Sequence, residues 1–162
     1  MSAIHNRKKN RLSDYDYSSP GAYFITVCTK ERKSIFSTVV GGDAHIAPYT
    51  VLTAAGAVVE KYLKRIPGIG HYVIMPNHVH MILHISAANP LEGPMWASAP
   101  TNVSIEDLVK SWKILVTKEL GESIWQRSYY DHIIRNEQEY VKIAQYILDN
   151  PAKWQDDRYY QV

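Results

Sequence analysis

The stretch HYVIMPNHVHMILHI, residues 71 to 85, places His78, His80 and His84 at alternating positions of an apolar run. Residues two apart in a β-strand point to the same face of the sheet, so this pattern predicts one apolar face and one histidine face. The predicted apolar, core-facing residues are Val79, Met81, Leu83 and Ile85. Two imidazoles at i and i+2 can chelate one ion, and neutral imidazole suits several divalent metals. Simple surface hydrogen bonding is the alternative for such a short motif, and a third ligand is needed to favour the metal.

The segment EQEYVKIAQYILDN, residues 137 to 150, supplies a candidate oxygen ligand and a candidate nucleophile. Helical periodicity predicts a helix from about Asn136 to Asn150, with an apolar stripe that we expect to be buried. That stripe comprises Tyr140, Val141, Ala144, Ile147 and Leu148. Tyr146 is expected on the opposite, polar face, and Asn150 follows one turn later on the same face. A half-exposed surface tyrosine is the simpler alternative.

The histidine strand and the tyrosine helix together suggest one mechanism. A metal held by His78, His80 and an oxygen ligand could polarise a phosphate, and a nearby phenol could attack the phosphorus. The product would be a covalent phosphotyrosine, which divides strand cleavage and rejoining into two steps. A simple hydrolase would not need this tyrosine.

The elements that position these residues alternate between strands and helices. The predicted strands are 21–29, 71–75, 78–85 and 128–135, and a small hairpin is expected around Gly41-Gly42 within 37–48. The predicted helices run from about Thr53 to Ile66, from Ser104 to about Leu120, and over the final segment described above. Ser104 and Asp107 form a possible capping box, and Pro67-Gly68 and Gly121 end the first two helices. Residues 86–103 are interpreted as a long surface loop.

The order strand, helix, strand, strand, helix, strand, helix is that of a split βαβ, ferredoxin-like α+β fold. This fold predicts an antiparallel four-stranded sheet with helices mainly on one face and the other face free for chemistry. A chain of 162 residues that is 46% hydrophobic is long enough for one domain with a real core, and we expect the single domain to cover residues 1–162.

Composition excludes some function classes and locations. The single cysteine, Cys28, excludes an internal disulfide framework and fits a reducing cytoplasm. No apolar run approaches the roughly 18 residues of a membrane span, and the basic N-terminus lacks the apolar region of a secretory signal. We therefore expect a cytoplasmic protein with no membrane partner. The net charge of +2 neither requires nor excludes nucleic acid.

Basic residues that could contact a phosphate backbone are unevenly distributed. Arg7, Lys8, Lys9 and Arg11 form a cluster without acids in the N-terminal arm, residues 1–12, although a solvated tail would look the same. Further candidates for contacts with DNA, in which exposed bases need aromatic or polar partners, are Lys110, Trp112, Lys113 and Arg127. An ordinary solvated helix face is slightly favoured for Lys110 and Lys113.

Several segments resemble one known family. MPNHVHMIL resembles the HUH motif (histidine, hydrophobic, histidine) of single-tyrosine transposases, and YILDNP resembles the segment that carries their nucleophile. RLSDYDYSSPGAYFITVCT and IWQRSYYDHIIRNEQEYVKIAQYILDNPAKW are similar to the REP-associated tyrosine transposases, a bacterial group related to insertion-sequence enzymes. The resemblance covers about residues 11 to 154.

The resemblance implies roles for individual residues. His78 and His80 would be metal ligands, Tyr146 the nucleophile and Asn150 the third ligand, with Mg²⁺ or Mn²⁺ as cofactor. The implied reaction cleaves single-stranded DNA and leaves a 5′-phosphotyrosine and a free 3′-hydroxyl. The implied substrates are hairpins of repetitive extragenic palindromes, so the protein would associate with the nucleoid when on DNA. A monomer is favoured, with a homodimer that shares its sites as the alternative.

Two other functions are compatible with the same residues. One is a nucleic-acid-binding module that keeps the fold and performs no chemistry. The other is a metal-dependent phosphodiesterase that uses an activated water, in which Tyr146 only orients the substrate. Tyr129 and Tyr130 become alternative nucleophiles only if the final helix is misread. The resemblance assigns no role to His84, for which hydrogen bonding is favoured over ligation.

Overall fold

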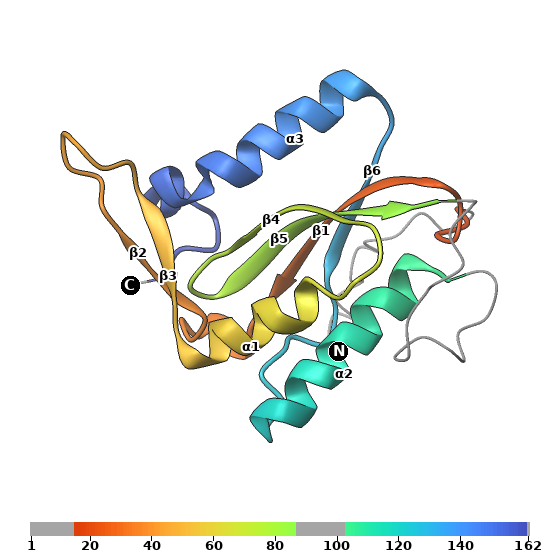
Figure 1. Ribbon diagram of the computed structural model, residues 1–162, viewed down its shortest axis with the longest axis horizontal. Coiled ribbons are helices and arrows are strands. Elements are labelled where there is room, and N and C mark those ends of the chain that lie inside the picture. The colour runs from red at the N-terminus through yellow and green to blue at the C-terminus, as the bar shows by residue number, and fades with distance from the viewer. Residues whose placement is uncertain (1–14, 87–102, 162) are drawn as a thin grey trace, which may run out of the picture.

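The computed structural model describes residues 15–86 and 103–161, and its centre is a four-stranded antiparallel sheet (Figure 1). The strand order is β4-β5-β1-β6, and all three neighbouring pairs are antiparallel. The strands are β1 (Gly21–Cys28), β4 (Ile69–Ile74), β5 (His78–Ile85) and β6 (Tyr130–Ile134). The predicted ferredoxin-like architecture is confirmed, with β5 and β1 as the two central strands.

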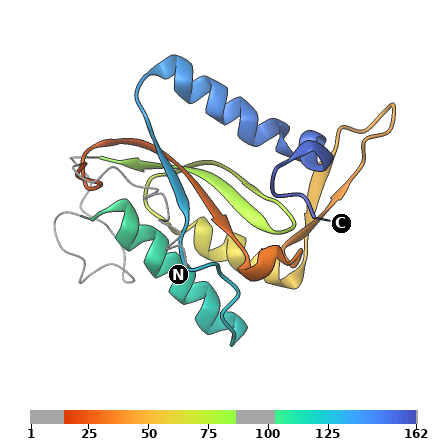
Figure 2. The same ribbon diagram turned by 180° about the vertical axis from the view of Figure 1, so that it is seen from behind.

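Two helices cover one face of the sheet, and the third crosses the other face. Helices α1 (Ala54–Leu63) and α2 (Ile105–Leu120) lie side by side below the sheet in Figure 1, and α3 (Glu137–Asp149) lies above it. The view from behind in Figure 2 shows the same three layers. The helices are therefore mainly on one face, as expected. The opposite face is not free, because α3 packs on it against β4 and β5.

Local sequence determines where each helix begins and ends. The Ser104 side chain accepts a hydrogen bond from the Asp107 backbone, and the Asp107 side chain accepts one from the Ser104 backbone, which is the predicted capping box. Gly121 ends α2 in the left-handed conformation at φ 76°. Asn136 caps α3 through the Glu139 N–H. The chain continues beyond α3 as a 3₁₀ segment, η2 (Asn150–Asp156), which contains Pro151.

The alternation in β5 divides its residues between the two faces as predicted. Val79, Met81 and Leu83 are fully buried against α1 and α2 in the main core, and Ile85 packs partly against it. His78, His80 and Ile82 face α3, together with β1 residues such as Phe24. A second, smaller apolar cluster lies between α3 and the sheet and comprises Phe24, Ile82 and Ile134 of the strands with Ala144 and Ile147 of α3.

The predicted orientation of α3 is wrong in part. Ala144 and Ile147 are buried and Tyr140 packs against the small cluster, but Val141 and Leu148 are 59% and 60% exposed. Tyr146 does not point away from the sheet, because its ring contacts Phe24 and His80. The prediction assumed that α3 packs its apolar stripe on the main core. The sheet face that α3 covers is instead partly polar, because it carries His78 and His80. Tyr146 and Asn150 therefore lie on the side of the chain that contacts this face.

The predicted hairpin forms a separate two-stranded sheet of β2 (Ser37–Val40) and β3 (Tyr49–Leu52). It projects from the main body beside the end of α3 (Figures 1 and 2). A short 3₁₀ turn, η1 (Lys30–Arg32), precedes it, and Glu31 and Arg32 both adopt positive φ angles. The N-terminal arm, 1–12, and nearly all of the predicted loop 86–103 lie outside the described residues.

Candidate active site

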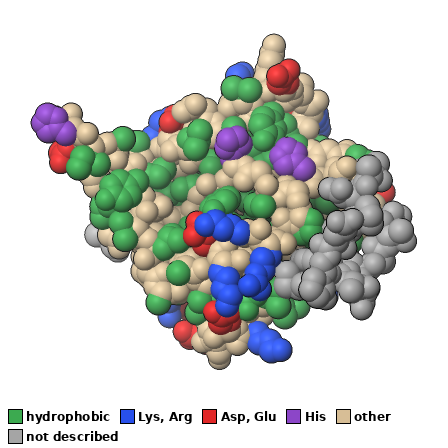
Figure 3. Space-filling model, in the orientation of Figure 1, with side chains coloured by type: hydrophobic (Ala, Val, Ile, Leu, Met, Phe, Trp, Pro, Cys, Tyr) green, Lys and Arg blue, Asp and Glu red, His purple; other side chains and the backbone are tan. Residues whose placement is uncertain are grey.

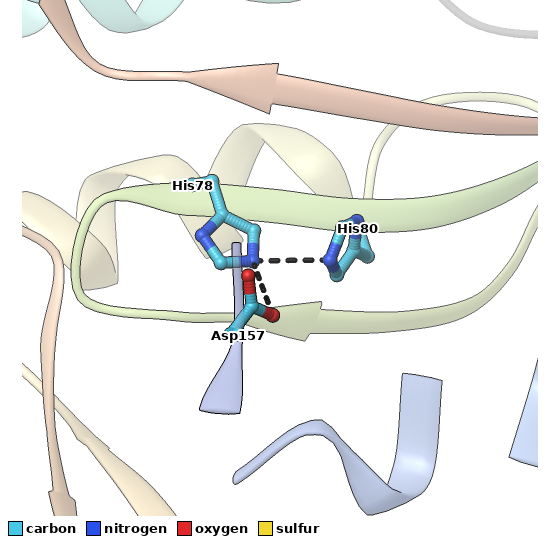
Figure 4. Close-up of side chains that lie close together, drawn as sticks. All are labelled: His78, His80 and Asp157. Carbon is cyan, nitrogen blue, oxygen red and sulfur yellow. Dashed lines mark hydrogen bonds and ion pairs between the residues drawn. The ribbon is translucent and has the colours of Figure 1, made fainter. Parts of the chain in front are cut away.

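His78 and His80 meet under α3 at the turn end of β5. Their Nε2 atoms are 3.0 Å apart, and their side chains are 0% and 1% exposed. Figure 4 shows the two rings projecting from the same strand toward Asp157, which comes from the segment after η2. The period-two alternation of the strand therefore converges both imidazoles on one point, as a chelating pair requires.

Asn77 determines which nitrogen of His78 carries the proton. The Asn77 Nδ2 donates to the carbonyl oxygens of Tyr159 (2.7 Å) and Arg32 (3.2 Å), so its Oδ1 is the atom that faces His78. That oxygen can only accept, and it lies 2.9 Å from His78 Nδ1. The proton of neutral His78 is therefore on Nδ1, and the Nε2 lone pair points into the site.

Thr26 plays the corresponding role for His80. It lies directly opposite His80 in the β1–β5 pairing, and its Oγ1 is 2.7 Å from His80 Nδ1. An imidazole whose Nδ1–H donates to the threonine presents its Nε2 lone pair on the same side as that of His78. Hydrogen bonds of this kind to the far nitrogen orient ligating histidines and set their tautomer.

Burial keeps both histidines neutral. Desolvation by burial, together with the nearby Arg158 and Arg32 charges, lowers the pKa of His78 to about 3. Burial also lowers the pKa of His80 well below its ordinary value, assisted by His78 and Arg158. Neutral imidazole is the form that binds metals, so the pair is ready to act as ligands at neutral pH.

Tyr146 places a phenol next to this pair. Its Oη is 3.3 Å from His80 Nε2, and its ring centroid is 5.2 Å from that of His80. Tyr146 as a whole is 38% exposed, whereas His78 and His80 are buried, so part of the tyrosine reaches the surface beside the buried pair. Burial and the Asp157 carboxylate raise the pKa of Tyr146, whereas the Asn150 amide and the Arg158 charge act to lower it.

Two oxygen donors complete the site. Asn150 is 1% exposed, its amide affects the pKa of both His78 and Tyr146, and its Oδ1 accepts no hydrogen bond among the described residues. Asp157 Oδ2 lies 4.0 Å from His78 Nε2, and its side chain is 4% exposed. One ligand atom each from His78, His80 and Asp157 falls within 4.8 Å of the others. Two neutral imidazoles with buried oxygens fit a divalent ion.

Asp157 is the site residue that sequence reasoning missed. It follows Asp156 in the run QDDRYY, where nothing distinguishes a buried acid from an exposed one. Its position depends on the backbone after Pro151, which turns back toward β5. The Tyr159 N–H donates to Asp157 Oδ1 at 2.7 Å, which leaves Oδ2 facing His78. The only sequence signal for an acidic ligand is that Asp156 and Asp157 follow shortly after the predicted Tyr146 and Asn150.

The predicted DNA contacts on α2 require correction. Trp112 cannot stack on a base, because it is 1% exposed and its Nε1 donates to the Val59 carbonyl in the core. Lys113 is half-buried, and its Nζ donates to the Gln126 carbonyl at 2.6 Å, which joins α2 to the loop before β6. Lys110 and Arg127 are exposed, and Lys110 lies on the helix layer across the sheet from the histidines.

Charged side chains of both signs mix on that helix layer, as Figure 3 shows over the α1–α2 region. Lys61 pairs with Glu119 at 2.6 Å, and Lys64 pairs with Glu60 at 3.0 Å. A mixed surface of this kind fits an ordinary solvated helix face, which the sequence slightly favours over a DNA contact for Lys110. The basic cluster Arg7, Lys8, Lys9 and Arg11 lies outside the described residues.

His84 lies apart from the site, at the far end of β5. It is exposed, and its Nε2 is 3.4 Å from the Tyr140 Oη. The hydrogen-bonding role favoured for His84 is thus compatible with its position. His71 packs edge-on against the same Tyr140 ring.

Comparisons with known proteins place the chain in a family. An uncharacterized protein from Haemophilus influenzae is 32% identical over 176 residues, covering 97% of this chain and 94% of that protein. No family model matches the sequence. A solved structure of a REP-associated tyrosine transposase bound to a REP hairpin matches with a TM-score of 0.57 at 22% identity, over 88% of this chain and 74% of that one.

The chain therefore belongs to the same family as the Haemophilus influenzae protein. Its fold is that of the REP-associated tyrosine transposase, which agrees with the resemblance found in the sequence. No helix in residues 15–86 or 103–161 is both long and apolar enough to cross a membrane.

Proposed function

We propose that the protein is a DNA strand transferase of the single-tyrosine HUH type, acting on single-stranded DNA beside a hairpin. The observation that carries this proposal is the convergence of Tyr146 Oη on His80 Nε2, which is itself 3.0 Å from His78 Nε2. A partly exposed tyrosine beside two buried, neutral imidazoles is an arrangement suited to phosphoryl transfer. The shared fold with a transposase that is bound to a REP hairpin supports hairpin DNA as the substrate.

Tyr146 is the proposed nucleophile. Its Oη forms a bond to the phosphorus while the bond from phosphorus to the 3′-oxygen breaks, so the new 5′-phosphate end stays on the enzyme and a free 3′-hydroxyl is released. The phenol proton that is lost balances the proton that the 3′-oxygen gains. Rejoining reverses these changes with the 3′-hydroxyl of another strand as the attacking group.

His78 and His80 are the proposed nitrogen ligands of Mg²⁺ or Mn²⁺, and Asn150 and Asp157 are the candidate oxygen ligands. When bound, the ion supplies a Lewis acid that neutralises charge on the phosphate and orients it. Asn77 and Thr26 hold the two imidazoles in the ligating orientation. Both oxygen donors are of the type that Mg²⁺ and Mn²⁺ accept, so either can complete the site.

The site would also serve a metal-dependent phosphodiesterase, and the fold alone would serve a binding module. A labelled hairpin DNA with single-stranded flanks, incubated with Mn²⁺, separates these functions. A transferase gives a protein–DNA adduct that resists SDS and is absent with EDTA or in Tyr146→Phe. Cleavage that persists in Tyr146→Phe identifies a phosphodiesterase, and binding without cleavage across a panel of hairpins identifies a binding module.

The basic arm is the proposed contact with the DNA backbone. Neutralising Arg7, Lys8, Lys9 and Arg11 together should weaken DNA binding and flatten its dependence on salt. Fewer phosphate contacts would then form, so binding would release fewer counterions from the DNA. An unchanged salt dependence would exclude the arm. A monomer remains the proposed state, with a homodimer as the alternative.

A further inference from the structure

The segment that follows η2 brings a second charged residue to the site besides Asp157. This segment, Asp157–Tyr160, is fixed against the turn end of β5 by two hydrogen bonds from other parts of the chain. Asn77 Nδ2 donates to the Tyr159 carbonyl at 2.7 Å, and Arg32 Nη1 donates to the Arg158 carbonyl at 2.9 Å. The Tyr159 ring then packs on His78, with 4.6 Å between ring centroids.

Arg158 contacts two aromatic rings close to the histidine pair. Its guanidinium carbon is 4.7 Å from the Tyr159 ring centroid and 5.6 Å from that of Tyr130. One of its terminal nitrogens donates to the Tyr159 hydroxyl. Tyr130 and Tyr146 both contact Phe24, and the Arg158 charge acts to lower the pKa of Tyr146, so Arg158 and the Tyr146 phenol lie near each other on the same face of the sheet.

No carboxylate among residues 15–86 and 103–161 forms an ion pair with Arg158, although Asp157 is its neighbour in the chain. The Asp157 carboxylate is engaged by the Tyr159 N–H and faces His78 instead. Arg158 is exposed, and the Tyr159 hydroxyl accepts from only one of the terminal nitrogens of its planar fork of donors. Within the described part of the chain, Arg158 is thus an oriented guanidinium that no carboxylate pairs with, close to the candidate nucleophile.

We propose that Arg158 binds a non-bridging oxygen of the phosphate that Tyr146 attacks. This rests on the proposed function and assigns the substrate contact of that site to a residue outside its metal ligands and nucleophile. A guanidinium matches the geometry of two phosphate oxygens, and it stabilises the charge that develops on them during transfer. Arg32 is the positioning residue, because it fixes the Arg158 backbone and stacks at 5.1 Å on the Tyr159 ring.

The test separates phosphate binding from cleavage. Binding of a fluorescent hairpin DNA with single-stranded flanks is measured in EDTA and in a Tyr146→Phe background, so no strand is cut. Arg158→Gln is compared with Arg158→Lys and with Arg65→Gln. Arg65 is the matched control, since its exposed guanidinium lies 5.3 Å from the Tyr62 ring centroid just after α1, on the helix-layer side of the sheet.

In Arg158→Gln, the slope of log affinity against log salt should fall by about 0.7, the value for one contact with a single-stranded phosphate. Arg158→Lys should retain the slope, and Arg65→Gln should leave it unchanged. A neutral methylphosphonate is then placed in turn at each position of the flanks. At one position it should weaken binding by the Arg158 protein and have little further effect on Arg158→Gln, because both changes remove the same contact.

Effects that add independently at every position, or an unchanged salt slope in Arg158→Gln, would overturn the assignment. Circular dichroism melting of Arg158→Gln shows whether the fold is kept, and the coupling to a single phosphate is a local readout that misfolding would not give. Adduct formation with Mn²⁺ is scored separately. A contact between Arg158 and one phosphate without any adduct would contradict the strand-transferase function and reduce the role of Arg158 to DNA binding.

Discussion

The Tyr146 hydroxyl lies 3.3 Å from Nε2 of His80, although the two residues are 66 positions apart in the chain. One residue belongs to α3 and the other to β5, so the contact depends on how the helix sits on the sheet. Ile147 and Ala144 fix that position by packing into the small cluster with Phe24 and Ile82. The candidate nucleophile is thus positioned by an apolar contact one residue away.

Truncation of Ile147 should therefore affect both stability and activity. Ile147 is fully buried, so Ile147→Ala should lower the free energy of unfolding by about 2–5 kcal/mol and reduce adduct formation. Leu148→Ala is the matched control, because Leu148 is 60% exposed and should change stability by less than about 0.5 kcal/mol. Urea denaturation of both variants provides the measurement. Equal losses in the two variants would contradict the observed orientation of α3.

Features that depend on neighbouring residues could be predicted from the sequence, whereas the orientation of α3 could not. The period-two pattern in β5 identified its two faces and the full extent of the strand, and the capping box and Gly121 identified the bounds of α2. These features depend on neighbouring residues, and local rules describe them well. The burial of Val141 and Leu148 was predicted wrongly, since it depends on which surface α3 covers.

Asp157, Asn77 and Thr26 mark what local patterns cannot supply. Thr26 reaches His80 through the register of β1 against β5, and Asn77 holds a segment that is 82 residues away. Asp157 reaches the histidines only after the chain has turned back past Pro151. Each of these contacts requires the assembled tertiary structure. Trp112 illustrates the converse error, because an amphipathic helix places its aromatic residue in the core by default.

The identity of the oxygen ligand can be decided by substitution. If Asp157 binds the metal, Asp157→Asn should weaken Mn²⁺ binding strongly, because the ion loses a charged ligand, while Asn150→Ala should weaken it less. If Asn150 is the ligand, the order is reversed. Isothermal titration with MnCl₂ measures both, with Asp156→Asn as the exposed neighbouring control. Unchanged affinity in both variants would exclude the two candidates together.

Thr26 should influence metal binding without touching the metal. Thr26→Val preserves shape but removes the oxygen that lies 2.7 Å from His80 Nδ1, so the imidazole loses its orientation. We expect Mn²⁺ affinity to fall about 10–100-fold, the usual effect of losing such a partner. Thr38→Val, on the exposed side of β2, should have no effect on affinity. A Thr26→Val protein with full Mn²⁺ affinity would contradict the role assigned to this threonine.

The buried histidines should make stability depend on pH. The pKa of His78 is lowered from 6.5 to about 3 in the folded protein, so between these values the unfolded chain binds a proton that the folded chain does not. The contribution of His78 to stability is therefore greatest above pH 6.5 and falls as the pH decreases. Between about pH 6.5 and 5 the loss attributable to His78 is about 2 kcal/mol.

Urea denaturation at several pH values in EDTA tests this dependence. His78→Asn should show a shallower loss of stability on acidification than the unmodified protein, and His45→Asn serves as the control at an exposed position. If His78→Asn and the unmodified protein lose stability equally over that interval, His78 is not buried in its neutral form.

The central claim is that Tyr146 is the residue that becomes joined to DNA. Its most direct test is to digest the SDS-resistant adduct formed with Mn²⁺ by protease and nuclease and to locate the residual nucleotide by mass spectrometry. The account predicts a single modified tyrosine, Tyr146, on the peptide that contains Ile147 and Asn150. Modification of another tyrosine, such as Tyr130 on the other side of Phe24, or cleavage without any modified peptide, would contradict it.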